Sequence, residues 1–253
     1  MDLGIDGKTA LITGGSKGIG LAVAEVFAQE GCHVHLAART EAELMAAADK
    51  IRGAHNVRVE THVSDLSNSG NLKALAAACP DIDILINNAG AIPRGTLDEM
   101  DDETLRQSWE LKLFGYINLT RIVYAAMKER GKGVIINVIG GAAENPRHDY
   151  IAGTMANVAL SNLCKALGKE SQNHGVRVVG IHPGLTKTER MISQHEYVAE
   201  HKFGDAGRWE ETLPKSPFAR PAEPEEVAYM VAFYASERAS YTSGTVVSIS
   251  GGV

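Results

Sequence analysis

Short runs of apolar residues alternate along the chain with longer segments in which apolar residues recur every three or four positions. The short runs are typical of strands in a parallel sheet, because such strands are buried on both faces. The longer segments have the period of helices that bury one face. The pattern predicts strands at Thr9–Thr13, His33–Ala37, Val57–His62, Ile84–Asn87, Gly133–Asn137, Arg177–His182 and Thr245–Ile249.

Strands and helices that alternate through short connections predict an α/β fold. Right-handed crossovers would then give a doubly wound, parallel sheet of about seven strands with helices on both faces. No repeat, low-complexity tract or linker interrupts the pattern, so residues 1–253 are expected to form one domain. The predicted helices are Leu21–Glu30, Glu41–Ile51, Asn71–Ala78, Thr104–Lys128, Thr154–Asn173 and Pro224–Ala235.

The longest stretch without a clear period runs from about residue 186 to residue 224. It contains Tyr197, Phe203 and Trp209 among charged residues. Irregular segments of this length in a compact domain commonly cover a binding site. We therefore expect a lid over the substrate here.

Composition narrows the possible partners. The formal net charge is −6, which argues against nucleic acid as a partner. No apolar run reaches the ~20 residues needed to cross a bilayer, and the first residues are not a signal peptide, so a cytoplasmic protein is expected. Cys32, Cys79 and Cys164 show no metal-ligand spacing, so they are interpreted as reduced thiols and no metal is expected.

Candidate chemistry begins at the first strand, which leads into Thr13-Gly14-Gly15-Ser16-Lys17-Gly18-Ile19-Gly20 and then into a helical run. Glycines allow a tight turn and close approach of the backbone to a phosphate. The N–H groups and dipole at the start of the helix favour negative charge. Strand, turn and helix together predict a dinucleotide site.

Two further motifs follow apolar strands, Asn87-Asn88-Ala89-Gly90 and His182-Pro183-Gly184. With these three motifs the chain resembles the short-chain dehydrogenase/reductase family along almost its whole length. The resemblance implies a Rossmann-like fold, a nicotinamide cofactor and a small carbonyl or alcohol substrate. It implies cofactor contacts at Gly14, Ser16, Lys17, Gly18, Ile19, Gly20, Arg39, Asp65, Leu66, Asn88, Ala89, Gly90, Pro183, Gly184 and Thr186. Within this set, Asp65 is expected to hold the adenine amino group, Asn88 to Gly90 to pack on the adenosine, and Pro183 to Thr186 to lie against the carboxamide. A degenerate fold without a ligand is the alternative.

The tip of the second strand bears on the choice of cofactor. NAD-specific sheets place a carboxylate there to bind the ribose 2′-hydroxyl. This chain has Ala38 followed by Arg39 instead, and Lys17 lies in the glycine turn. Two cations suit a 2′-phosphate, so NADP(H) is the preferred cofactor and NAD(H) remains possible. The alternative is that Arg39 stacks on adenine and Lys17 is a solvated charge.

The catalytic positions of the family carry other residues here. Counting back from Glu170 places the family's catalytic lysine at Asn157 and its tyrosine at Gly153. The catalytic serine falls on Gly140, and the assisting asparagine falls on Lys112. The chain therefore resembles a divergent member that lacks the Ser, Tyr, Lys and Asn side chains at the expected positions.

The lysine and asparagine positions have exchanged identities, which favours a rewired site. Tyr150 precedes Gly153 by three residues, nearly one helical turn, and Gly153 leaves space into which it could lean. We expect Tyr150 to be the proton donor and acceptor and Lys112 to lower its pKa and orient it. Asn157 is expected to hold Lys112 or the nicotinamide ribose.

Each residue also has a simpler interpretation. Tyr150 could only pack the mouth of the cleft, and Lys112 could pair with Glu110. His148 and Asp149 fit a solvated turn, with His148 as a reserve acid–base group.

The expected function is hydride transfer between nicotinamide and an alcohol or ketone. The alternatives are a catalytically silent NADP(H)-binding protein, acting as a sensor or partner subunit, and a non-redox lyase or isomerase. The helices Thr104–Lys128 and Thr154–Asn173 pair between subunits in the family, so a homo-oligomer is expected, a tetramer or a dimer.

Overall fold

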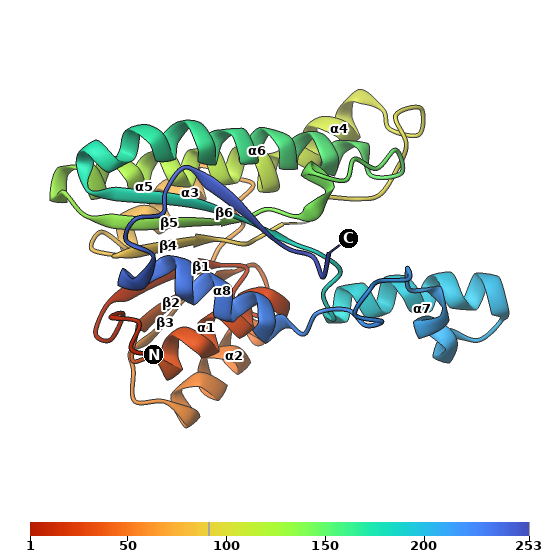
Figure 1. The fold of residues 1–253 in the computed structure, drawn as a ribbon, viewed down its shortest axis with the longest axis horizontal. Coiled ribbons are helices and arrows are strands. Elements are labelled where there is room, and N and C mark those ends of the chain that lie inside the picture. Colours follow the sequence, from red (N-terminus) through yellow and green to blue (C-terminus); the bar gives the residue numbers. More distant parts are fainter. Residues whose placement is uncertain (91, 253) are drawn as a thin grey trace.

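The computed structural model describes residues 1–90 and 92–252, and seven parallel strands form one sheet in it, in the order β3-β2-β1-β4-β5-β6-β7 (Figure 1). The order reverses between β1 and β4, which is the switch point of a doubly wound fold. The predicted fold class is therefore confirmed. The strands are β1 Thr9–Thr13, β2 His33–Ala38, β3 Val59–Val63, β4 Ile84–Asn87, β5 Gly133–Val138, β6 Val176–Pro183 and β7 Thr245–Ile249.

Helices cover both faces of the sheet (Figure 1). Apolar residues of α1, α2 and α8 pack on one face, and those of α3, α5 and α6 pack on the other. The strand centres are buried between the two layers, which explains why the strands read as continuous apolar runs. The helices are α1 Gly18–Gln29, α2 Glu41–Ala54, α3 Ser69–Ala78, α4 Asp102–Trp109, α5 Tyr116–Arg130, α6 Ile151–Glu170, α7 Glu189–Phe203 and α8 Pro224–Ala235.

The single helix predicted at Thr104–Lys128 is instead three consecutive segments. A π-helical turn, Glu110–Gly115, joins α4 to α5. At Gly115 a side chain would stand 3.1 Å from the carbonyl oxygen of Leu66, so the helix approaches the loop after β3 closely there. Such turns insert one residue without interrupting the helix, so the apolar period does not reveal them.

The segment predicted to be irregular, residues 186–224, contains the 15-residue helix α7 and a 3₁₀ segment at Ala206–Thr212. Thr188 caps α7 by accepting a hydrogen bond from the Met191 N–H. Only Met191 and Ala199 of α7 are buried, so the apolar period that marks the other helices is weak here. In Figure 1, α7 projects from one end of the molecule. Among the described residues, no helix combines the length and the apolar character that a bilayer crossing requires.

Candidate active site

The glycine turn after β1 has the backbone that a phosphate site requires. Gly14 and Gly18 have φ values of +66° and +57°, in the left-handed region that glycine tolerates. A side chain on Gly20 would overlap the Gly14 carbonyl, so α1 begins directly against the turn. The turn therefore aims the start of α1 at the edge of the sheet where a ligand would bind.

The loop after β4 is tied to this turn by side-chain hydrogen bonds. The Thr13 hydroxyl accepts from the backbone N–H groups of Asn88 at 2.9 Å and Ala89 at 3.1 Å. The Asn88 amide donates to the carbonyls of Thr13 at 3.1 Å and Gly14 at 3.3 Å. Asn88 thus supports the glycine turn at the switch point. Thr13 was not among the predicted site residues, although its place at the end of β1 was a usable signal.

The loop after β3 brings Asp65 and Leu66 to the same edge. Asp65 accepts hydrogen bonds from the Ser67 N–H at 3.0 Å and the Ser67 hydroxyl at 2.7 Å. These bonds, with a smaller effect of Arg39, hold the pKa of the Asp65 carboxyl below its usual value. Leu66 is buried in the core, so it positions the loop from beneath.

The two cations predicted to bind a 2′-phosphate are both exposed. Lys17 forms an ion pair with Glu43 of α2, with 3.0 Å between Nζ and Oε1. An exposed pair of this kind contributes little free energy, so a phosphate can compete for the ammonium. Arg39 lies directly after β2, beyond the last residue of that strand. Ser16, in the glycine turn, and Ile19, at the start of α1, are both half-buried.

The loop after β6 meets the glycine turn from the other side. Pro183 ends β6, and the Gly184 N–H donates to the Ile249 carbonyl at 2.9 Å. The buried Thr186 hydroxyl donates to the Gly184 carbonyl at 3.1 Å. A side chain on Gly18 would stand 3.2 Å from Thr188, so this loop and the turn lie together.

The ring of Tyr150 lies where the sequence analysis expected it. A side chain at Gly153 would overlap the Tyr150 ring, so the tyrosine occupies the space that Gly153 leaves open. The ring packs beside Ile92, Ala152 and Ala156 and is half-buried. Burial raises the pKa of its phenol, while the charges of nearby arginines, Arg190 first, act in the opposite direction.

Lys112 makes different contacts from those expected. Its ammonium donates to the Val138 carbonyl at 2.8 Å and to the Tyr116 hydroxyl at 3.1 Å. Among the described residues, Lys112 forms no ion pair with Glu110 and no hydrogen bond with Tyr150. Burial, and then the charge of Arg190, lower the Lys112 pKa to about 7. Lys112 was expected to lower the pKa of Tyr150 and to orient it, but its hydrogen bonds go to Val138 and Tyr116, because the π-helical turn directs its side chain toward β5.

Asn157 is buried and holds Gly140 rather than Lys112. Its amide donates to the Gly140 carbonyl at 3.3 Å. Its Oδ1 is buried and has no hydrogen-bond partner among the residues that the structure describes. An orphaned buried acceptor is costly. A hydroxyl of a nicotinamide ribose is one group that would satisfy it, so this part of the site fits the cofactor.

Ser161 and His182, which lie next to Asn157, are linked to it by hydrogen bonds. The Ser161 hydroxyl donates to the Asn157 carbonyl at 2.6 Å and lies 2.8 Å from His182 Nε2. On the other side of the ring, His182 Nδ1 is 3.3 Å from a Glu144 carboxylate oxygen. Burial lowers the pKa of His182, although Glu144 opposes the shift.

Arg190, in the first turn of α7, is a site residue that the sequence analysis missed. Its guanidinium donates to the carbonyls of Gly90 at 3.0 Å and Ile92 at 3.1 Å. Its charge acts on both Lys112 and Tyr150. The two carbonyls that it contacts lie about one hundred residues earlier in the chain. No local sequence pattern could have predicted these contacts.

The turn before Tyr150 is charged and partly solvated. Asp149 pairs with Arg147 at 2.8 Å and with Arg94 at 3.4 Å. These arginines lower the Asp149 pKa, so its carboxylate is ionised at neutral pH. His148 is exposed, as the interpretation of this segment as a solvated turn requires. This charged turn therefore lies directly before Tyr150, the expected acid–base residue.

A parallel sheet whose strand order reverses beside a glycine turn is the architecture that binds dinucleotides at the carboxyl ends of its strands. The sequence profile described as "short chain dehydrogenase" matches residues 8–198. The chain therefore belongs to the short-chain dehydrogenase family. At the level of that family, the expected function as an NAD(P)-dependent oxidoreductase of alcohols and ketones is confirmed.

Individual relatives share about a third of their residues with this chain. Galactitol 2-dehydrogenase (L-tagatose-forming) of Cereibacter sphaeroides is 32% identical, over 98% of this chain and 95% of the relative. The 7alpha-hydroxysteroid dehydrogenase of Escherichia coli K12 is 29% identical, over 99% and 96%. The structure of L-sorbose reductase from Gluconobacter frateurii, complexed with NADPH and L-sorbose, superposes with a TM-score of 0.94 at 34% identity, over 100% of this chain and 98% of that one.

Proposed function

We propose that this protein interconverts a small polyol and its ketose with NADP(H), and that Tyr150 exchanges the proton with the substrate oxygen. The observation that carries the proposal is the position of the Tyr150 ring, which fills the space of the absent side chain at Gly153. By the resemblance to the family, position 153 is where the proton-transferring hydroxyl belongs. A phenol supplied from position 150 takes over that place.

When bound, the nicotinamide supplies the redox equivalent at the substrate carbon. The protein then has to bind, orient and move one proton. In the reducing direction, the Tyr150 hydroxyl donates to the oxygen on which negative charge develops. The phenolate that remains is stabilised by Arg190, whose charge already opposes the effect of burial on the Tyr150 pKa.

Lys112 acts in this proposal through its charge. Its pKa of about 7 lies close to neutrality, where a group can carry or release a proton with little cost. In this proposal its protonated ammonium adds to the charge of Arg190, the first of the three arginines that act on the Tyr150 phenol. Asn157 contributes its unpaired Oδ1 to a ribose hydroxyl of the cofactor.

The choice of NADP(H) rests on the tip of β2. The chain has no carboxylate at Ala38 or Arg39 to bind a ribose 2′-hydroxyl, and Arg39 and Lys17 are both exposed near that position. A guanidinium binds a phosphate through two hydrogen bonds. Among similar structures, L-sorbose reductase is complexed with NADPH and 7 alpha-hydroxysteroid dehydrogenase with NADH, so the choice depends on the residues of this chain.

The substrate class rests on the polar mouth of the cleft. Arg190, Arg94 and Arg147 all act on the Tyr150 phenol, and Arg94 and Arg147 also pair with the carboxylate of Asp149. Such a surface suits a substrate with many hydroxyl groups better than a large apolar one. The sugar substrates in the names of the galactitol and L-sorbose relatives support the same class.

We propose that residues 186–224, which include α7, cover the mouth of the cleft. Arg190 joins α7 to the loop after β4 through its two hydrogen bonds.

The test is NADPH consumption with a panel of carbonyl substrates. We expect turnover with ketoses, weaker turnover with apolar ketones, and product alcohols equal in amount to the NADPH consumed. Tight NADPH binding without turnover on any carbonyl would show a silent binder instead. Conversion of a substrate without a change in the nicotinamide absorbance would show a lyase or isomerase.

A further inference from the structure

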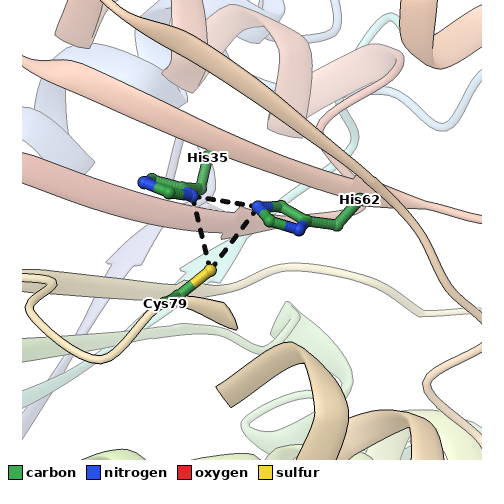
Figure 2. Close-up of side chains that lie close together, drawn as sticks. All are labelled: His35, His62 and Cys79. Carbon is green, nitrogen blue, oxygen red and sulfur yellow. Dashed lines mark hydrogen bonds between the residues drawn. The ribbon is translucent and has the colours of Figure 1, made fainter. Parts of the chain in front are cut away.

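Three potential metal ligands converge at the edge of the sheet, away from the cofactor site. His35 lies on β2, His62 lies on β3, and Cys79 directly follows α3 (Figure 2). His35 Nδ1 is 2.9 Å from His62 Nε2. The Cys79 sulfur is 3.4 Å from His35 Nδ1 and 3.5 Å from His62 Nε2.

The sheet register explains how residues so far apart in sequence meet. His35 pairs with Glu60 across β2 and β3, and His62 lies two residues beyond Glu60. Side chains two apart on a strand share a face, so both rings project to the side of the sheet that α3 covers. Cys79 closes the cluster from the end of α3. The chain spacing carries no metal motif, which is why the sequence analysis expected no metal.

The distances fit a tetrahedral ion. Zinc binds imidazole nitrogen at about 2.0–2.1 Å and thiolate sulfur at about 2.3 Å. Tetrahedral angles then place two nitrogens about 3.4 Å apart, and nitrogen and sulfur about 3.6 Å apart. Both sulfur distances are within about 0.2 Å of this geometry. Only the two rings would need to separate, by about 0.5 Å.

Burial and charge also suit a cation. Cys79 is buried, and both imidazoles are half-buried, so the ligand atoms are shielded from bulk water. One ring nitrogen of each histidine faces the other, and the Cys79 sulfur lies close to both of these nitrogens. The Glu60 carboxylate acts on all three groups and is exposed on the same face.

We propose that His35, His62 and Cys79 bind a zinc-type divalent ion, with Glu60 or a water molecule in the fourth position. On binding, the Cys79 thiol loses its proton to solvent and forms a sulfur–metal bond. The ion would join β2, β3 and α3 at an otherwise open edge, since β3 has a neighbour on one side only. His35 lies in the middle of β2, and Arg39 follows the end of that strand, so the proposed ion lies outside the dinucleotide site.

Cobalt(II) titration of the untagged, chelator-treated full chain tests the site, because cobalt reports a thiolate ligand by its absorption. We expect one cobalt per chain, a thiolate-to-cobalt charge-transfer band in the near ultraviolet, and displacement of that band by one equivalent of zinc. Zinc should also raise the melting temperature of the chelator-treated protein.

Variants locate the ion. Cys79→Ser should abolish the charge-transfer band, and His62→Gln should weaken cobalt binding at least ~10-fold. Cys164→Ser, which changes a buried thiol in α6, should behave like the unmodified chain. Retained NADPH binding shows that each variant is folded. Absence of the band in the unmodified chain, or an unchanged band in Cys79→Ser, would overturn the proposal and leave the cluster as hydrogen bonds among two imidazoles and a thiol.

Discussion

Gly153 and Tyr150 carry the proposal that the site keeps a proton-transferring hydroxyl although its position in the sequence has changed. The ring of Tyr150 reaches the space over Gly153 from just before α6. The sequence predicted this contact because the two residues are one helical turn apart. It did not predict the contacts of Lys112 or Arg190, which depend on a π-helical turn and on a partner segment distant in the chain.

Lys112 carries a prediction on pH dependence. Its pKa is lowered to about 7, so it is protonated below that pH and neutral above it. If, as proposed, the protonated form adds to the charge of Arg190 on the Tyr150 phenol, ketone reduction should be fastest below about pH 7 and fall as the pH rises through that value. Lys112→Met should slow the reaction and remove this limb of the kcat profile. Lys128→Met, on the exposed surface of α5, is the matched control. A limb that persists unchanged in Lys112→Met would contradict the proposed role.

At the scale of elements, the end of β2 carries the prediction on cofactor choice. If Arg39 and Lys17 bind the 2′-phosphate, NADPH should bind at least ~10-fold more tightly than NADH, or about 1.4 kcal/mol. Arg39→Asp should reverse the preference, because a carboxylate repels the phosphate and accepts from a 2′-hydroxyl. Calorimetric titration with both cofactors measures this, and Arg106→Asp on exposed α4 should have no effect. Equal affinities in the unmodified protein would refute the assignment.

The elements that were predicted well are those whose periods come from burial. β1, β4, β7 and α8 have the predicted bounds, and the other strands differ by one or two residues at their ends. α7 was missed because it buries only Met191 and Ala199. The glycine turn could be located from local sequence alone, because the backbone conformation of Gly14 and Gly18 requires glycine.

At the scale of the whole molecule, the outer face of α6 predicts assembly. Met155 and Val158 are 38% and 39% exposed, and Phe114, in the π-helical turn beside α6, is 42% exposed. Apolar side chains gathered in this way are commonly covered by a second copy. We expect a tetramer, with a mass by light scattering four times the 27.0 kDa of the chain. Val158→Lys should give smaller species, and a monomer in the unmodified protein would contradict the expectation.

Long-range contacts set the limit of what the sequence predicts about the sites. His35, His62 and Cys79 meet only because of the register between β2 and β3 and the place where α3 ends. Arg190 likewise meets Gly90 only because the fold brings the start of α7 to the loop after β4. Neither cluster has a local spacing that sequence analysis could recognise.

The central claim is that Tyr150 is the proton-transferring residue, and single-substitution kinetics test it most directly. Tyr150→Phe keeps the ring and removes only the hydroxyl, so the NADPH dissociation constant should not change. Turnover should fall by roughly 10²–10⁴, the range for loss of a positioned acid–base group. Tyr241→Phe, which changes a fully exposed tyrosine, should retain full activity. A Tyr150→Phe enzyme that turns over at the rate of the unmodified protein would contradict the claim.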